Sequence, residues 1–283
     1  MSAWLCSFTD RCPFFQSSFC GHNTNKPLLL SYHPEPDSST IFECYVEHMI
    51  NCWNEWQNLA PKWINPVKRI LSSVTGVQID KESFQKAMSL VILHHDVGKL
   101  TKEYQEKKFF RHEIISAYIL YRQFDEEFRE DESNILPAIL ASAVYLHHEA
   151  LQISHNYFEM RDPTYSYLLH LLSSRTFNMI EHFNELINQM NQKYITLSPS
   201  VTSSLVGKPI MGTDVARTLS SMIVTVDGYS EPLVTRIAVA AVLHPLTICD
   251  NLAANKRGGT PSSLSKALIS FFNDGAITVR ENE

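Results

Sequence analysis

Two segments of the chain are helical in pattern, almost wholly apolar toward their ends, and finish in residues that can bind metal. The first, "KESFQKAMSLVILHHD", spans residues 81–96 and ends in two histidines and Asp96. The second, "ILPAILASAVYLHH", spans residues 135–148, has a proline in its first turn and ends in two more histidines. Helices this apolar must be buried, and adjacent histidines at a buried end must both find partners. The chain is therefore constrained to carry polar ligands into its core.

The rest of the pattern is also helical, because strand alternation is weak throughout. Asp80 can cap the first of the two apolar helices, and polar residues at 38–40 can cap an earlier helix that runs to about Leu59. Further helices are predicted from periodicity and from restart or capping residues at 101–108, 112–124, 165–173, 175–194 and 232–257. The fold class predicted from these segments is all-α.

Composition and the positions of turn-forming residues suggest one domain that follows an irregular N-terminal segment. Residues 1–37 carry several turn formers and little periodicity, so we expect an irregular lead-in followed by a single domain over residues 38–283. With 44% hydrophobic residues the chain can form a substantial core. Residues 196–214 are polar and broken by proline and glycine, which is typical of a mobile loop or an insertion.

Several features indicate a cytoplasmic protein. No continuous apolar run reaches the roughly 20 residues that cross a bilayer, so no membrane association is expected, and the N-terminus lacks the pattern of a signal peptide. Six cysteines are too sparse for a disulfide scaffold at this length. The net charge of −6 argues against a protein that coats nucleic acid by bulk charge, although local basic patches remain open.

The segment "LVILHHDVGKLTKEYQ" contains the strongest indication of chemistry. His95 and Asp96 are neighbours on a helix, so their side chains diverge by about 100°. They can coordinate one metal from two sides, or the carboxylate can bridge two metals. A buried carboxylate is costly unless a cation or a strong hydrogen-bond donor compensates it. Gly98 then allows the chain to turn, and Lys99 places a cation beside the carboxylate.

Other candidate ligands are weaker when each is taken alone. His48 lies on the buried stripe of its helix, where a histidine is more often satisfied by core partners than bound to metal. His112 opens its helix, where a neutral imidazole is unremarkable. Asp250 lies in an apolar helix, and its ordinary interpretation is a helix-end carboxylate bonded to backbone or paired with Lys256 or Arg257.

The order of these residues is more specific than any one of them. A histidine, then H-D-x-G-K, then a histidine, a histidine pair and an aspartate resembles the HD superfamily of metal-dependent phosphohydrolases, particularly its two-metal branch. The resemblance covers roughly residues 38–260 and is closest to the HD nuclease of type I CRISPR interference. Its most specific part is "HDVGKLTKEYQ" followed by "RHEIISAYI". It implies an HD-domain helical bundle with the metal site in a central cleft.

The resemblance also implies roles for individual residues. It assigns the first metal to four residues: His48, His95, Asp96 and Asp250. It assigns the second metal, to which Asp96 would bridge, to three: His112, His147 and His148. Asp96 and Lys99 would be the catalytic residues, with Lys99 acting at the scissile phosphate. The histidines outside this set are interpreted as structural, with His94 the best candidate to support a ligand.

The types of ligand indicate which metal ions the site would bind. Two divalent ions about 3.5–4 Å apart can activate a water and neutralise charge on a phosphodiester. A set rich in histidine with only two carboxylates favours transition ions such as Fe, Mn, Co or Ni over magnesium, which prefers oxygen ligands. Magnesium could still support slow turnover.

A basic segment between two of the proposed ligands is the candidate for substrate binding. Its cations are Lys102, Lys107, Lys108 and Arg111, and its aromatic residues are Tyr104, Phe109 and Phe110. This mixture suits a single-stranded backbone and stacked bases. The alternative is a solvated helix face with buried aromatic rings.

The family resemblance implies the biological setting. The chain has no G-x-x-x-x-G-K-[ST] loop, because "SLVGKPI" lacks the first glycine and the hydroxyl residue, so it cannot be its own helicase motor. The expected function is a standalone nuclease that cleaves single-stranded DNA, or RNA, in antiviral CRISPR interference. Its expected partners are a separate helicase and an RNA-guided surveillance complex. The alternatives are a phosphohydrolase of nucleotides or cyclic nucleotides and an inactive HD scaffold, and the intact ligands argue against the scaffold.

Overall fold

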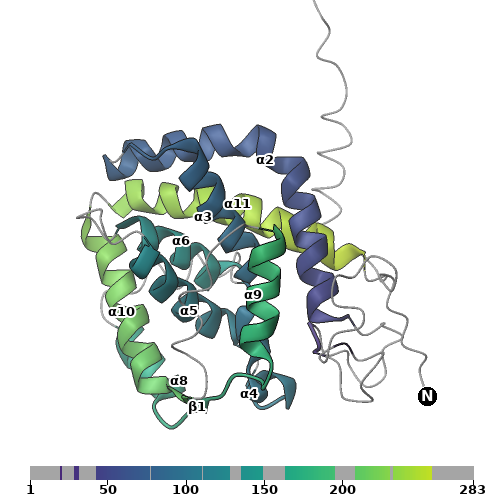
Figure 1. Ribbon diagram of the computed structural model, residues 1–283. Coiled ribbons are helices and arrows are strands. Elements are labelled where there is room, and N and C mark those ends of the chain that lie inside the picture. The colour runs from purple at the N-terminus through teal and green to yellow at the C-terminus, as the bar shows by residue number, and fades with distance from the viewer. Residues whose placement is uncertain are drawn as a thin grey trace, which may run out of the picture.

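The computed structural model describes residues 20, 29–31, 43–76, 78–109, 111–127, 135–148, 163–194, 208–229 and 232–256. These residues form a bundle of helices with one two-stranded sheet at its lower edge (Figure 1). The all-α prediction is confirmed.

The first long helix, α2, starts and ends later than its sequence pattern predicts. It spans Tyr45–Thr75, and the predicted cap residues at 38–40 lie outside the described residues. Its first half buries Tyr45, His48, Cys52 and Trp56, the stripe expected to face the core.

Two prolines do not end helix α2, contrary to the prediction that it stops near Leu59. Pro61 and Pro66 lie inside it, and the helix ends only at Gly76, which adopts a left-handed conformation with φ of 68°. Figure 1 shows that α2 changes direction along its length, as expected where proline removes a backbone donor and crowds the preceding turn.

The predicted apolar helices are both present. Helix α3 (Lys81–His94) is capped by Asp80, whose side chain accepts from the backbone N of Ser83 at 2.9 Å, and its residues from position 87 to its end are all buried. Helix α6 (Ile135–Leu146) is buried at every residue and packs against α2, α3 and three further helices, so it lies at the centre of the bundle. The ends of α3 and α6 therefore bring their polar residues into the interior.

Short elements connect α3 to the next long helix. After α3 the chain forms the 3₁₀ helix η1 (Val97–Leu100) and the short helix α4 (Lys102–Gln105), which ends before the predicted limit at residue 108. Helix α5 (His112–Glu127) follows, begins at its histidine as predicted, and packs against both η1 and α6.

The prediction of one helix over residues 175–194 is wrong in its first part. Helix α8 (Pro163–Leu172) is followed by strand β1 (Thr176–Phe177), and helix α9 begins later, at Phe183–Tyr194. Strand β1 pairs antiparallel with β2 (Ile210–Met211), more than 30 residues away. This long-range pairing overrides the local helical preference.

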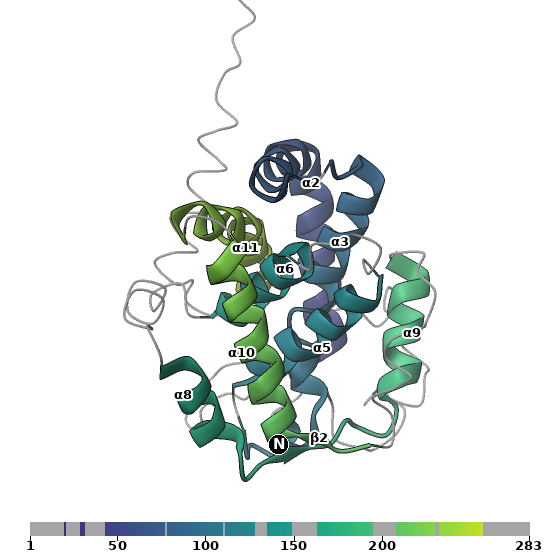
Figure 2. The same ribbon diagram turned by 90° about the vertical axis from the view of Figure 1, so that its left-hand side faces the viewer.

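Two helices complete the fold. Helix α10 (Gly212–Tyr229) is not predicted from the sequence, and its first residues, like strand β2, fall in the segment 196–214 that is expected to be a loop. It packs against α5, α6 and α8 (Figure 2). Helix α11 (Pro232–Asn255) packs along α2 and α6 and contains Pro245. By length and hydropathy alone α11 could cross a membrane, but half of its most apolar window is buried in the bundle, as in an ordinary core helix.

Candidate metal centre

The seven residues predicted to bind metal lie together at the centre of the bundle. Together with Cys52 they form two groups of donor atoms, with the atoms of each group within 4.8 Å of one another. The groups draw on five segments that are distant in sequence: the first turns of α2 and α5, the ends of α3 and α6, and the last part of α11. Burial of the two apolar helix ends therefore assembles the site.

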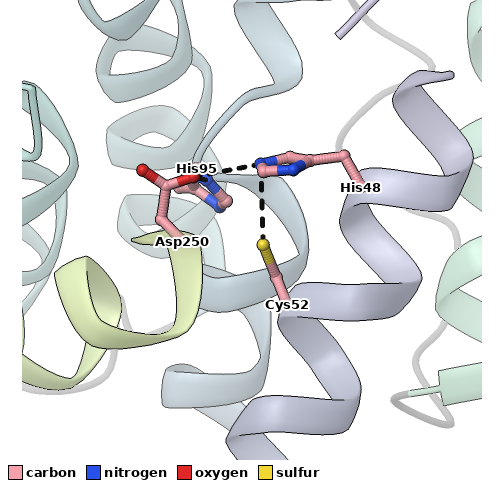
Figure 3. A group of neighbouring side chains, drawn as sticks. All are labelled: His48, Cys52, His95 and Asp250. Carbon is pink, nitrogen blue, oxygen red and sulfur yellow. Dashed lines mark hydrogen bonds and ion pairs between the residues drawn. The ribbon is translucent and has the colours of Figure 1, made fainter. Parts of the chain in front are cut away.

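The first group consists of His48, Cys52, His95 and Asp250 (Figure 3). The Nε2 atom of His48 lies 3.0 Å from the Oδ1 atom of Asp250 and 3.6 Å from the Sγ atom of Cys52. The Nε2 atom of His95 lies 3.6 Å from the same aspartate oxygen. Asp250 therefore faces histidines rather than Lys256, which pairs with Glu55.

The second group consists of Asp96, His112, His147 and His148. The Oδ1 atom of Asp96 lies 2.9 Å from Nε2 of His112, 3.4 Å from Nε2 of His147 and 3.9 Å from Nε2 of His148. The side chain of His148 is 39% exposed, whereas the other side chains of this group are at most 8% exposed. His148 is therefore the member of this group whose side chain reaches solvent.

Asp96 lies between the two groups. Its Oδ1 atom faces the second group, and its Oδ2 atom lies 3.4 Å from Nε2 of His48 and 3.5 Å from Nε2 of His95. One carboxylate therefore presents one oxygen to each group, which is the arrangement needed to bridge two metals.

The polar atoms at the centre fit a divalent cation. Nδ1 of His95 donates to the carbonyl of Ile92 at 2.9 Å, and Nδ1 of His147 donates to the carbonyl of Val144 at 2.6 Å. Because a carbonyl only accepts, each neutral ring is left with a lone pair on Nε2 that points inward. Within the described part of the chain, these two Nε2 atoms are buried without a hydrogen bond. Such atoms are costly unless a cation satisfies them.

Electrostatics keep Asp96 and His112 in forms that can bind metal. Burial alone would raise the pKa of Asp96, but the Lys99 ammonium and the neighbouring His95 and His112 rings hold it well below its usual value. Burial and the charge of Lys99 lower the pKa of His112, which favours the neutral imidazole. An ionised carboxylate beside neutral imidazoles is the state that metal binding requires.

Lys99 is the cation that balances Asp96 in this structure. Its Nζ atom lies 2.6 Å from Oδ2 of Asp96, and the residue is only 6% exposed. The expectation that Asp96 needs a compensating partner is met by this pair. The role of Lys99 at a phosphate stays a prediction.

The basic segment is exposed, but its aromatic residues are not. Lys102, Lys107 and Lys108 are exposed, and the last of these pairs with Glu106. Arg111 has a side chain that is one-third exposed and pairs with Glu113.

The aromatic part of the substrate-binding prediction is wrong for the two rings that the structure describes. Tyr104 is buried and donates to the carbonyl of Ser31 at 3.0 Å, and Phe109 packs edge-on against Phe177. Neither ring is therefore placed to stack on a base. Phe110 lies outside the described residues.

The histidines interpreted as structural stay outside the two donor groups wherever the structure describes them. His94 faces away from the centre, with its Nε2 atom 2.6 Å from Oδ1 of Asn191, and burial lowers its pKa to about 4. His244 stacks on Trp63, and His182 lies near Glu185. His94 therefore supports the packing of α9 rather than a ligand.

Two polar residues near the site were missed from the sequence. Cys52 lies one helical turn after His48, so the i, i+4 spacing alone could have indicated it. Glu43 lies just before α2, is buried, and places its Oε1 atom 3.3 Å from Nδ1 of His48. A carboxylate on the far nitrogen of a histidine fixes the tautomer that presents Nε2 to a metal.

We expect Glu43→Ala to weaken binding of divalent metal by about 10- to 100-fold, because His48 would lose its orienting acceptor. Glu43→Gln keeps an acceptor oxygen and should retain most of the affinity. Competition with a coloured chelator measures the effect, and Glu82→Ala, at an exposed carboxylate of α3, is the matched control. Unchanged affinity in Glu43→Ala would show that His48 is oriented by packing alone.

Comparison with known proteins places the chain in one family. A family model described as "Cas3, HD domain" matches residues 33–211, a range that contains every proposed ligand except Asp250. Among curated proteins, the CRISPR-associated endonuclease Cas3-HD of Pyrococcus furiosus is 28% identical over 233 residues, which cover 79% of this chain and 92% of that protein.

Two comparisons with Methanocaldococcus jannaschii point the same way. Its CRISPR-associated endonuclease Cas3-HD is 26% identical over 232 residues, covering 79% of this chain and 90% of that protein. A solved structure of a CRISPR-associated Cas3 HD domain protein from that organism superposes with a TM-score of 0.54 at 26% identity. The superposition covers 72% of this chain and 95% of that structure.

Proposed function

We propose that this chain, which belongs to the Cas3 HD domain family and is an HD-type nuclease of CRISPR systems, cleaves single-stranded DNA with two divalent metal ions. The observation that carries the proposal is Asp96, which offers one oxygen to each of two adjacent groups of donor atoms. A single-metal site has no use for such a shared carboxylate.

The chain's own residues prepare the site for phosphodiester hydrolysis. When bound, two divalent ions would activate a water and neutralise negative charge on the phosphate. The carbonyls of Ile92 and Val144 hold His95 and His147 in the orientation that directs Nε2 inward. Lys99 keeps a positive charge against Asp96, at the place where a phosphate would approach. The substrate would reach the site on the side of His148, whose side chain is exposed.

The donor atoms favour transition metals. Five imidazoles, two carboxylates and a thiol suit Fe, Mn, Co or Ni better than magnesium, which prefers oxygen ligands and keeps much of its water. We therefore expect the transition ions to support faster turnover and magnesium to support slow turnover.

Single-stranded DNA is the proposed substrate because the exposed lysines form a local basic patch on a chain that is acidic overall. Lys102 and Lys107 lie in the segment between η1 and His112, on a chain whose net charge is −6. Such a patch can follow one phosphate backbone. These 283 residues contain no phosphate-binding loop for ATP. We propose that a separate helicase supplies the strand and that an RNA-guided surveillance complex selects it.

The test is a cleavage panel with the purified protein. Single-stranded DNA, blunt duplex DNA, single-stranded RNA and a set of nucleotides are each incubated with Mn, Fe, Co, Ni or Mg and with a chelator. We expect metal-dependent cleavage of single-stranded DNA, little cleavage of blunt duplex, and none with the chelator. Hydrolysis of free nucleotides without cleavage of any polymer would favour the nucleotide phosphohydrolase instead.

A further inference from the structure

The first donor group contains a thiol that is absent from the ligand pattern of histidines and aspartates. His48 and Cys52 come from successive turns of α2, and Figure 3 shows the thiol directed at the ring of His48. The Nε2 atom of His48, which faces Asp250, is also the atom that lies 3.6 Å from Sγ of Cys52. Donor atoms of three kinds, nitrogen, oxygen and sulfur, are therefore directed toward one another.

The spacing of these atoms matches a coordination shell. A metal with bonds of about 2.0–2.1 Å to nitrogen and about 2.3 Å to sulfur holds those two atoms about 3.5–3.6 Å apart when the shell is tetrahedral. The measured separation of Nε2 and Sγ is 3.6 Å. The separations of 3.0 and 3.6 Å between Oδ1 of Asp250 and the Nε2 atoms of His48 and His95 bracket the corresponding value of about 3.4 Å.

A second observation points to a ligand at the same place. The Nε2 atom of His95 is fully buried and, among the described residues, has no hydrogen-bond partner. Its Nδ1 atom already donates to Ile92, so Nε2 of the neutral ring can only accept. The thiol of Cys52 therefore lies in the same group as a buried nitrogen lone pair, that of His95, which has no donor to accept from.

Ordinary burial of a cysteine does not explain the arrangement. Cys249 is also fully buried and is the neighbour of Asp250 in sequence, yet it does not belong to the donor group. Cys52 differs because the i, i+4 spacing places it on the same face of α2 as His48. The contrast between the two thiols provides a matched control.

We propose that Cys52 is a ligand of the first metal position, beside His48, His95, Asp250 and the bridging Asp96. A thiolate makes this position softer than the second, whose donors are three imidazoles and one carboxylate oxygen. The first position should therefore bind zinc, cobalt or ferrous iron in strong preference to magnesium. The inference rests on the proposed metal-dependent function, and the experiment separates the two.

The experiment is a titration of the metal-free protein with Co²⁺, followed by absorption spectroscopy. A thiolate bound to Co²⁺ gives an intense charge-transfer band in the near ultraviolet, whereas nitrogen and oxygen ligands give only weak visible bands. We expect the band to saturate at one equivalent in the wild-type protein, to be lost in Cys52→Ser and to persist in Cys249→Ser. Circular dichroism shows whether each variant is folded, and the wild-type spectrum tests the proposal without any variant.

Each result has a distinct meaning. Binding of two Co²⁺ equivalents without the band in the wild-type protein overturns the role of Cys52 and leaves the two-metal nuclease intact. A band that survives in Cys52→Ser assigns the sulfur to another cysteine and also overturns the inference. Absence of any Co²⁺ binding contradicts both proposals. With zinc, X-ray absorption should show one sulfur at about 2.3 Å, and a shell of only nitrogen and oxygen overturns the proposal.

Discussion

Replacing Asp96 with asparagine should abolish cleavage of single-stranded DNA and empty both metal positions. Among the described residues, only Asp96 contributes an oxygen to both donor groups, so its loss affects each of them. We expect activity to fall by more than about 100-fold, the upper end for residues that merely support a ligand. Cleavage assays and elemental analysis of the same preparations measure the two effects.

Asparagine is the sharper substitution because of Lys99. Asp96→Ala would leave the buried ammonium of Lys99 without its carboxylate, and breaking a buried ion pair in this way costs about 3–5 kcal/mol of stability. The amide oxygen of asparagine can still accept a hydrogen bond from Lys99, although the ion pair is lost, so denaturant unfolding of the same variant separates a loss of metal from a loss of fold. Asp214→Asn, at an exposed ion pair of α10, should change neither metal content nor activity.

The second donor group gives an internal comparison. His147→Ala removes a ligand from that group alone, so metal content should fall toward one equivalent while activity still collapses. Asp96→Asn should lower the content further. If Asp96→Asn kept two metals and normal cleavage, the central carboxylate would be a structural ion-pair partner, and the two-metal proposal would be lost.

The sequence predicts the parts of this fold whose cause is local. Asp80 is followed by a helix that grows apolar toward its end, and the structure has that cap and that burial. The segment 175–194 is different because strand β1 depends on pairing with residues 210–211, which no local pattern contains. Helix α2 likewise passes through Pro61 because tertiary packing compensates for the lost hydrogen bond.

The same distinction holds for the site. The two apolar helix ends indicate that His95, Asp96 and the histidine pair are buried, but not which atoms face each other. Cys52 and Glu43 were missed because a thiol in a core stripe and a glutamate before a helix have ordinary interpretations. Their significance comes from the packing of α2 against α3 and α11, which fixes distances of a few ångströms.

Gly98 has a different role in the structure from the one predicted from the sequence. From the sequence, its backbone freedom is expected to let the chain turn. In the structure it lies inside η1, and Gly76 and Lys107 are the described residues with positive φ. Gly98 instead allows a close approach, because a Cβ atom there would lie 2.2 Å from the carbonyl oxygen of His112 and 3.0 Å from the backbone N of Ser116.

Gly98→Ala should therefore destabilise the protein by more than about 3 kcal/mol, beyond the usual cost of an overpacked core. The clashing atoms are backbone, so no side-chain rotation relieves the contact, and η1 must move away from α5. That movement separates Asp96 from His112, which lie 2.9 Å apart across the same contact, so metal affinity should fall with stability. Denaturant unfolding and metal titration measure the two losses.

The matched control for this prediction is Gly228→Ala in helix α10. A Cβ atom at Gly228 meets nothing within 4 Å, so alanine there should leave metal binding unchanged and raise stability by up to about 1 kcal/mol through helix propensity. If Gly98→Ala unfolded within about 0.5 kcal/mol of the wild-type protein and bound metal normally, η1 would be able to yield. The spacing between Asp96 and His112 would then be set by the metals rather than by the packing of the backbone.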